Sequence, residues 1–236
     1  MSQQVDVQHA RRVVAQHAKT SSLFGVDFVP VRGSLDPKPD ADTGGAVKAL
    51  KALRARYEKE KPHEPFISSY KNIVWDDGDP CARLMFVGEA PGADEDEQGK
   101  PFVGRAGQLL NKMISAMGLS RESVYIANVL KVRPPGNATP TAEEIQASKP
   151  FLMEQIKIVR PEVIVGLGLP AAKCLLQTNE AMGKIRNRFH EIEIEPGITV
   201  PVMPTYHPAY LLRSYTPENR KKVWDDLQMV LEKLGK

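Results

Sequence analysis

The sequence predicts an α/β fold: a three-layer αβα sandwich around a central, mainly parallel four-stranded sheet. Two observations support this prediction. The first is a set of four short apolar runs, typical of strands buried on both faces, at residues 84–87, 124–127, 163–167 and 200–203. The second is a helical pattern of crossover length in residues 106–117 and again in 142–159. Helical crossovers between successive strands favour parallel pairing.

The N-terminal part differs in composition from the rest of the chain. Residues 1–62 are polar and rich in Ala, Lys and Arg, with weak helical patterns over 3–19 and 43–60 and a loop rich in Pro, Gly and Asp near 33–45. We interpret residues 1–62 as a helical extension that packs on the domain. Residues 63–236 then form a single α/β domain.

Helix starts and a hairpin are marked in the second half of the chain. Thr141, followed three residues later by Glu144, has the spacing of a capping box, and Thr216-Pro217 marks another helix start. Apolar positions from Val223 onward repeat at helical spacing, which predicts a terminal helix packed on the sheet. Residues 188–195 and 198–204, around a Pro-Gly pair, predict a hairpin or a bent strand.

Composition excludes several classes of protein. The chain has 236 residues, 42% apolar and 26% charged, with a net charge of +3, which suits one globular domain without proving a polyanionic partner. No run of eighteen apolar residues and no secretion signal is present, so we expect a cytoplasmic protein without a membrane partner. Only two cysteines occur, too few for a disulfide framework or a four-thiolate metal site.

Residues that carry chemistry are expected where the strands end, because ligands of open parallel sheets bind beyond the carboxyl ends of the strands. Small, bent loops follow all four predicted strands, and three of them carry a prominent polar side chain. The loops are Gly88-Glu89-Ala90-Pro91-Gly92, Asn128 with residues 131–137, Gly166-Leu167-Gly168, and residues 206–213 with His207. The sequence therefore predicts a site that includes Glu89, Asn128 and His207.

The first of these loops allows more than one interpretation. Gly88 and Gly92 permit close backbone approach, and Glu89 adds a carboxylate to the crevice. A glycine loop before a helix also suits a phosphate, as in a nucleotide-binding hydrolase. The loop lacks a Gly-Lys-Ser/Thr ending, and the carboxylates of residues 94–96 would repel phosphate. We favour a catalytic or substrate-binding loop over a phosphate loop and over a plain turn with a solvated Glu89.

Three ordered motifs occupy these loops. The first comprises residues 88–96 (GEAPGADED) and 99–110 (GKPFVGRAGQLL), the second residues 128–137 (NVLKVRPPGN), and the third residues 207–213 (HPAYLLR). In this order and spacing they resemble the motifs of the family 4 uracil-DNA glycosylases. The resemblance implies a monofunctional DNA repair enzyme that hydrolyses the N-glycosidic bond of uracil in DNA and leaves an abasic site, in a hydrolysis step that is metal-independent.

The resemblance also implies a cofactor whose ligands are missing here. Family 4 enzymes typically hold an iron–sulfur cluster on four cysteines, two near the N-terminus, one in the central loop and one in the following helix. The last two positions read Val132 and Ser148 in this chain, and neither Cys81 nor Cys174 matches a ligand position. We therefore expect no cofactor, and we expect apolar packing by residues such as Val132, together with residues 1–62, to replace the cluster.

The resemblance assigns roles to residues of the pocket. Phe102 would stack on uracil, and the amide of Asn128 would pair with the uracil edge and disfavour cytosine, with Gly88 and Ala90 as further uracil-binding residues. His207 would donate a hydrogen bond near uracil O2, where negative charge accumulates as the glycosidic bond breaks.

A carboxylate is expected to act on the sugar side of the bond. Glu89 would position or activate water and offset the positive charge that develops on the sugar. Other branches of the superfamily carry an Asp one position later, where this chain has Ala90, so Glu95 is a second candidate for this task. A solvated side chain or a helix-start anion is the alternative interpretation of Glu95.

The remaining predicted contacts are with DNA that contains uracil. Arg133, Asn137 and Arg213 are candidates for contact with the DNA backbone, and Leu211 or Leu212 for a wedge that enters the base stack as the uracil leaves. We expect the protein to act as a monomer. Two alternatives stay open: a catalytically weak binder of uracil or abasic sites, and a glycosylase with a different deaminated-base preference.

Overall fold

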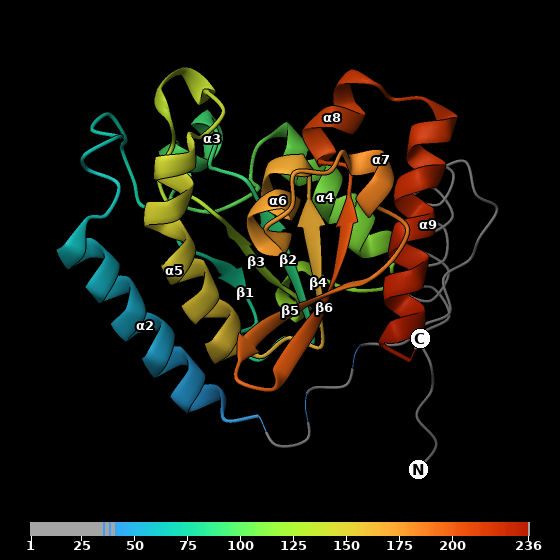
Figure 1. Ribbon diagram of the computed structural model, residues 1–236, viewed down its shortest axis with the longest axis horizontal. Coiled ribbons are helices and arrows are strands. Elements are labelled where there is room, and N and C mark those ends of the chain that lie inside the picture. Colours follow the sequence, from blue (N-terminus) through green and yellow to red (C-terminus); the bar gives the residue numbers. More distant parts are fainter. Residues whose placement is uncertain (1–34, 36–37, 39–40, 236) are drawn as a thin grey trace, which may run out of the picture.

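A computed structural model describes residues 35, 38 and 41–235 of the chain. Within these residues one six-stranded sheet has the strand order β1-β3-β2-β4-β6-β5 (Figure 1). The strands are β1 (Asp77–Gly78), β2 (Leu84–Gly88), β3 (Tyr125–Asn128), β4 (Val163–Leu167), β5 (His190–Glu195) and β6 (Ile198–Thr205). The α-helices are α2 (Thr43–Glu60), α3 (Ala93–Gln98), α4 (Arg105–Ala116), α5 (Ala142–Val159), α6 (Leu169–Leu176), α7 (Met182–Ile185), α8 (Pro208–Arg213) and α9 (Pro217–Lys233), with short 3-10 helices at η1 (Arg121–Ser123) and η2 (Pro135–Asn137).

The inner four strands of the sheet, β3, β2, β4 and β6, pair in parallel, as the apolar runs predict. The predicted number of four strands is wrong, because β1 and β5 add antiparallel edges. β1 has only two residues, too few to leave an apolar signal. β5 alternates buried isoleucines with exposed glutamates, as expected for an edge strand with one face in solvent. The β5–β6 pair confirms the predicted hairpin.

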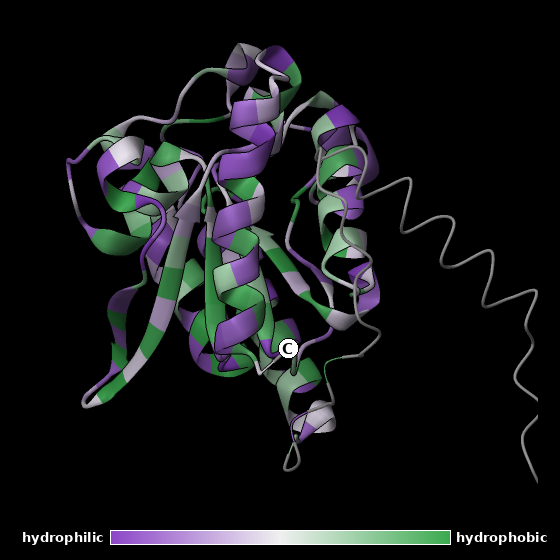
Figure 2. Cartoon of the chain, turned by 90° about the vertical axis from the view of Figure 1, so that its right-hand side faces the viewer, coloured by the Kyte–Doolittle hydropathy of each residue, from purple (hydrophilic) through white to green (hydrophobic). Residues whose placement is uncertain are grey.

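Helices cover both faces of the sheet, which gives the predicted αβα layers. On one face, apolar residues of α4 and α9 pack against Leu84 and Phe86 of β2. On the other face, residues of α5 and α6 pack against Met85 and Val87 of the same strand. Figure 2 shows the corresponding pattern, with apolar strands in the interior and hydrophilic residues on the outer sides of the helices. In the described ranges, no helix has the length and apolar character that a membrane crossing requires.

Capping explains where two helices begin. Thr141 accepts a hydrogen bond from the backbone N–H of Glu144, and the Glu144 carboxylate accepts one from the N–H of Thr141, so the predicted capping box forms. Thr216 caps α9 in the same way through the N–H of Asn219. These side chains satisfy backbone N–H groups that have no partner within the helix.

A layer of aromatic side chains joins α2 to the domain. Tyr57 of α2 lies edge-on to Phe151 of α5 at 4.9 Å between ring centroids, stacks on His63 at 5.2 Å and meets Trp75 at 5.3 Å. Leu53 joins the same buried cluster. The predicted helix at residues 43–60 is thus confirmed and lies against α5 (Figure 1), whereas the helical pattern at residues 3–19 lies outside the described residues.

The packing of α2 leads to a stability prediction. Leu53→Ala removes buried apolar volume between α2 and the domain, and we expect it to lower the free energy of unfolding by about 2–4 kcal/mol. Val47, which is exposed on the same helix, provides the matched control, and Val47→Ala should change the free energy by less than about 0.5 kcal/mol. Urea unfolding followed by circular dichroism measures both values. Equal losses in the two variants would show that α2 does not dock as described.

Candidate active site

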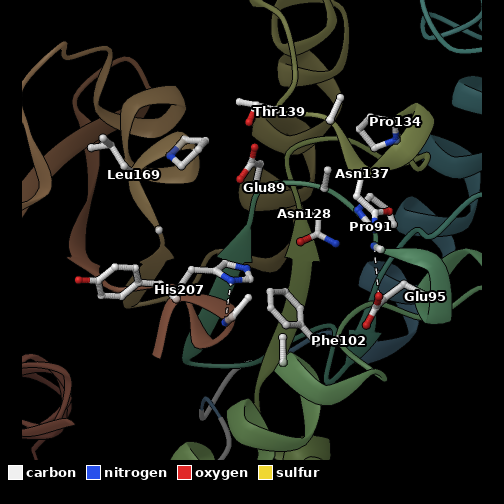
Figure 3. Close-up of a pocket in the computed structure, with 18 of the residues that line it drawn as sticks. Glu89, Pro91, Glu95, Phe102, Asn128, Pro134, Asn137, Thr139, Leu169 and His207 are labelled. Carbon is white, nitrogen blue, oxygen red and sulfur yellow. Dashed lines mark hydrogen bonds between the residues drawn. The ribbon is translucent and has the colours of Figure 1, made fainter. Parts of the chain in front are cut away.

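A cavity of about 630 Å³ lies at the carboxyl ends of the parallel strands. The sheet brings these ends together because β2, β3, β4 and β6 run side by side in the same direction. Most of the predicted site residues line the cavity: Glu89, Ala90, Glu95, Phe102, Asn128, Asn137, His207 and Arg213. Figure 3 shows Asn128, Phe102 and His207 grouped around one space, with Glu89 at its edge.

Gly88 permits two side chains of the site to approach each other closely. A Cβ on this residue would lie 2.3 Å from Asn128 Oδ1 and 2.5 Å from the Phe102 ring. Both distances are far shorter than van der Waals contact, so neither side chain could keep its position beside an alanine. Gly88 therefore shapes the pocket without lining it.

Asn128 ends β3, directly beside Gly88 of β2 in the sheet register. The residue is only 2% exposed, and its Oδ1 has no hydrogen-bond partner among the described residues. Buried carbonyl oxygens are nearly always hydrogen-bonded, and one without a partner costs free energy. An unpaired acceptor that lines a cavity is thus ready to accept a hydrogen bond from a ligand.

Lys131 fixes the backbone at Asn128 from behind. Its Nζ donates to the Asn128 carbonyl at 2.6 Å and to Gln155 Oε1 at 2.5 Å. Burial lowers the pKa of this lysine to about 7. Gln155 in turn donates to the hydroxyl of Tyr125, which donates to the Asp76 carboxylate. The motif contained Lys131, but its role depends on α5, which the sequence alone does not place behind the loop.

Phe102 contributes an aromatic wall to the cavity. Its ring centroid lies 5.6 Å from that of His207. The backbone of Phe102 has a φ of 52°, in the left-handed region that residues with a Cβ rarely adopt. The turn fits only because Gly107 has no side chain, since a Cβ there would lie 1.9 Å from the Phe102 carbonyl oxygen.

His207 is the N-cap of α8, and its Nδ1 accepts a hydrogen bond from the backbone N–H of Ala209 at 3.1 Å. Burial, with a smaller contribution from the charge of Arg213, lowers the pKa of His207 to about 4. The imidazole is therefore neutral at physiological pH, and because Nδ1 is the acceptor, the proton resides on Nε2. His207 can thus donate one hydrogen bond through Nε2.

Glu89 and Glu95 have different surroundings at the same cavity. Glu89 lines the cavity, and burial raises the pKa of its carboxyl group. Glu95 accepts three backbone hydrogen bonds, from Val103 and Gly104 at 2.9 Å and from Gly92 at 3.1 Å. Glu89 is therefore available for chemistry, whereas both oxygens of Glu95 are engaged in holding loops together.

Of the five predicted DNA-contacting residues, Asn137 and Arg213 line the cavity. Arg133 and Asn137 are joined by a 2.7 Å hydrogen bond, and Arg213 is exposed beside the cavity. Leu211 is fully buried in the hydrophobic core, whereas Leu212 is 44% exposed. Of the two leucines, only Leu212 is available to enter a base stack.

The residues present do not fit a four-thiolate iron–sulfur cluster. Val132 is packed in the apolar core and Ser148 is buried on α5, so the two predicted ligand positions offer no thiolate. Cys174 is buried against the sheet with its thiol pKa raised by burial to about 11, and Cys81 lies near Lys38. Thiolates are the ligands that such clusters require, and two separated thiols cannot supply four.

Comparisons with known proteins agree with this geometry. A family profile described as the Uracil DNA glycosylase superfamily matches residues 75–228. The Type-4 uracil-DNA glycosylase of Saccharolobus solfataricus is 44% identical over 170 residues, which cover 70% of this chain and 77% of the relative. The corresponding protein of Thermotoga maritima is 44% identical over 158 residues, or 66% and 80% of the two chains.

A more distant relative is also similar to this chain. The Type-5 uracil-DNA glycosylase of Pyrobaculum aerophilum is 34% identical over 149 residues, which cover 57% of this chain and 64% of the relative. The family profile covers more than half of the chain and includes all four strand ends that form the cavity. This chain therefore belongs to the uracil-DNA glycosylase superfamily.

Proposed function

We propose that this protein is a uracil-DNA glycosylase, a DNA repair hydrolase that releases uracil from DNA and leaves an abasic site. The proposal rests on membership of the superfamily, on relatives named Type-4 uracil-DNA glycosylase, and on one feature of the cavity. That feature is the buried, unpartnered Oδ1 of Asn128 beside an aromatic ring and a neutral imidazole. The N3–H of an everted uracil would supply the missing donor.

Asn128 would read the edge of the base. Uracil presents N3–H between two carbonyl oxygens, so the amide of Asn128 accepts from N3–H through Oδ1 and donates to O4 through Nδ2. Cytosine has an unprotonated N3 and an exocyclic amine, which reverse both contacts. Sites that hydrogen-bond their substrate discriminate strongly against analogues that leave buried polar groups unpaired. Phe102 would stack on the ring, and the small Ala90 would leave room for it.

His207 would stabilise the leaving group. As the bond between uracil N1 and the sugar C1′ breaks, the electron pair leaves with the base and negative charge collects on O2. A neutral imidazole that donates from Nε2 can stabilise that charge. Because His207 is already neutral, it does not have to be deprotonated before the reaction. Donors preorganised in this way contribute about 2.7–4 kcal/mol to the stabilisation of a transition state.

Glu89 would act on the other side of the breaking bond. Its carboxylate would orient a water molecule, accept a proton as the water oxygen bonds to C1′, and offset positive charge on the sugar. We assign no such step to Glu95, whose oxygens already accept three backbone hydrogen bonds. On the DNA side, Arg133, Asn137 and Arg213 would contact the backbone, and Leu212 would fill the space that the everted base leaves.

The proposal extends to the setting of the enzyme. We propose a cytoplasmic monomer that needs no small-molecule cofactor, in which residues 1–62 form an N-terminal extension of the α/β domain at 63–236. The contact of α2 with α5 supports the placement of the described part of that extension. Two other functions are possible in principle: release of a different deaminated base, and tight binding of uracil with weak turnover. Rates measured with several bases distinguish both from uracil release.

Removal of the two groups that act on the bond should abolish most turnover. We expect Glu89→Gln and His207→Ala each to lower the rate of uracil release from DNA by about 10²–10³-fold, with folding retained. The measurement is alkaline cleavage of abasic product from uracil-containing single- and double-stranded oligonucleotides in excess EDTA. Glu232→Gln, a change at an exposed carboxylate of α9, is the control and should keep full activity. Wild-type rates in both site variants would refute these assignments.

Asn128→Ala should reduce both rate and selectivity. Loss of the amide leaves the uracil N3–H unpaired, and we expect kcat/KM for uracil to fall by about 10–100-fold. Rates for uracil, cytosine, hypoxanthine and xanthine in the same sequence context measure the selectivity. Preference of the wild-type protein for a base other than uracil, or binding without release, would favour one of the two other functions.

The pH dependence should reveal the ionisation of Glu89. Burial raises its pKa above the ordinary value of 4.5, and only the ionised form can accept a proton. The rate should therefore fall as the pH falls through this raised pKa. His207 stays neutral above about pH 4, so it should add no further step. Single-turnover rates of the wild type and Glu89→Gln test this, since an acid limb that persists in the variant cannot come from Glu89.

A further inference from the structure

The turn that carries Phe102 is held in a conformation that its own sequence disfavours. Phe102 has a φ of 52° although it is not glycine, and left-handed backbone costs free energy for any residue with a Cβ. Such conformations persist only where the surrounding structure imposes them. The turn sets the direction in which the Phe102 ring enters the cavity, so the groups that hold its left-handed backbone also position the ring.

Arg121 holds the carbonyl side of the turn. From η1, its guanidinium donates to the Pro101 carbonyl at 2.6 Å and to the Phe102 carbonyl at 3.0 Å. It also donates to Asn111 Oδ1 at 2.9 Å and to the Asp77 carboxylate at 2.7 Å. The side chain is 17% exposed, so these contacts are largely shielded from water.

Glu95 holds the amide side of the same turn. One carboxylate oxygen accepts from the N–H groups of Val103 and Gly104, the two residues that directly follow Phe102. Consecutive peptide groups from 101 to 104 are thus bound by a cation on their carbonyls and by an anion on their amides. Hydrogen bonds to charged groups are about twice as strong as neutral ones, so this pair fixes the turn from two directions.

We infer that Arg121 is a positioning residue for the base-stacking Phe102, and that it acts together with Glu95 as a two-sided clamp on the 101–104 turn. The inference rests on the proposed function, since it concerns how the pocket holds an everted base. Arg121 does not line the cavity and takes no part in the chemistry. Its planar fork serves carbonyls that a single ammonium group could not reach together.

The first experiment compares two arginines with similar numbers of contacts. Arg121→Met should lower kcat/KM for uracil release by about 10–100-fold, because small misplacements of binding groups have effects of this size. Arg83 is the matched control: it lies just before β2, at the opposite end of the strand from the site, and donates to both oxygens of Glu162 and to the Leu234 carbonyl. Arg83→Met should keep the wild-type kcat/KM even if it lowers the melting temperature as much as Arg121→Met does.

The second experiment separates positioning from general stability. In a double-mutant cycle, Arg121→Met should have less than about a twofold effect on kcat/KM when Phe102 is already alanine, because the ring that Arg121 positions is gone. The same loss in the Phe102→Ala background as in the wild type would overturn the inference. If Arg121→Met does not fold, Arg121→Lys takes its place, since it keeps the charge while losing the fork.

Gly107→Ala gives an independent route to the same turn. The new Cβ would collide with the Phe102 carbonyl. Gly107→Ala should therefore reduce kcat/KM when Phe102 is present and have little effect when Phe102 is already alanine. Failure of the inference is distinct from failure of the proposed function. An active wild type with an equally active Arg121→Met variant refutes the clamp alone, whereas a wild type that releases no base refutes the function and the inference that depends on it.

Discussion

The approach of Asn128 and Phe102 over Gly88 is the contact on which the site depends. Parallel pairing of β2 with β3 places Gly88 beside Asn128, and the turn before α4 brings Phe102 across the same residue. Any side chain at position 88 would occupy the space that these two groups share. The sheet register and the turn therefore place the side chains of Asn128 and Phe102 around one residue without a Cβ.

Burial prepares the polar groups of the cavity for a ligand. Desolvation keeps His207 neutral, raises the pKa of Glu89 and leaves Asn128 Oδ1 without a partner. Each of these states costs free energy. Neighbouring hydrogen bonds nevertheless keep the groups in position. Lys131 donates to the Asn128 backbone carbonyl, and the Ala209 N–H donates to the His207 ring. The fold thus leaves Asn128 Oδ1 unpaired while hydrogen bonds hold the Asn128 backbone and the His207 ring in place.

The sequence alone predicted the four inner strands of the sheet and most of the residues that line the cavity. Strands covered on both faces leave continuous apolar runs, which predicted the four inner strands. The two-residue β1 is too short to leave such a run. The polar β5 has no such run either, and only the turn at Pro196-Gly197 predicted it, as part of a hairpin or bent strand. The motifs indicated which residues meet at the cavity. They could not show that Leu211 faces the core and Leu212 the solvent, nor that Arg121 reaches the Phe102 turn, because both depend on how distant elements pack.

A crystal structure of the Glu89→Gln variant with a uracil-containing oligonucleotide would show directly how the cavity holds the base. We expect an everted uracil stacked on Phe102, with N3 within hydrogen-bond distance of Asn128 Oδ1 and O2 within hydrogen-bond distance of His207 Nε2. A base bound elsewhere, or one in the cavity whose edge faces away from Asn128 and His207, would contradict this expectation.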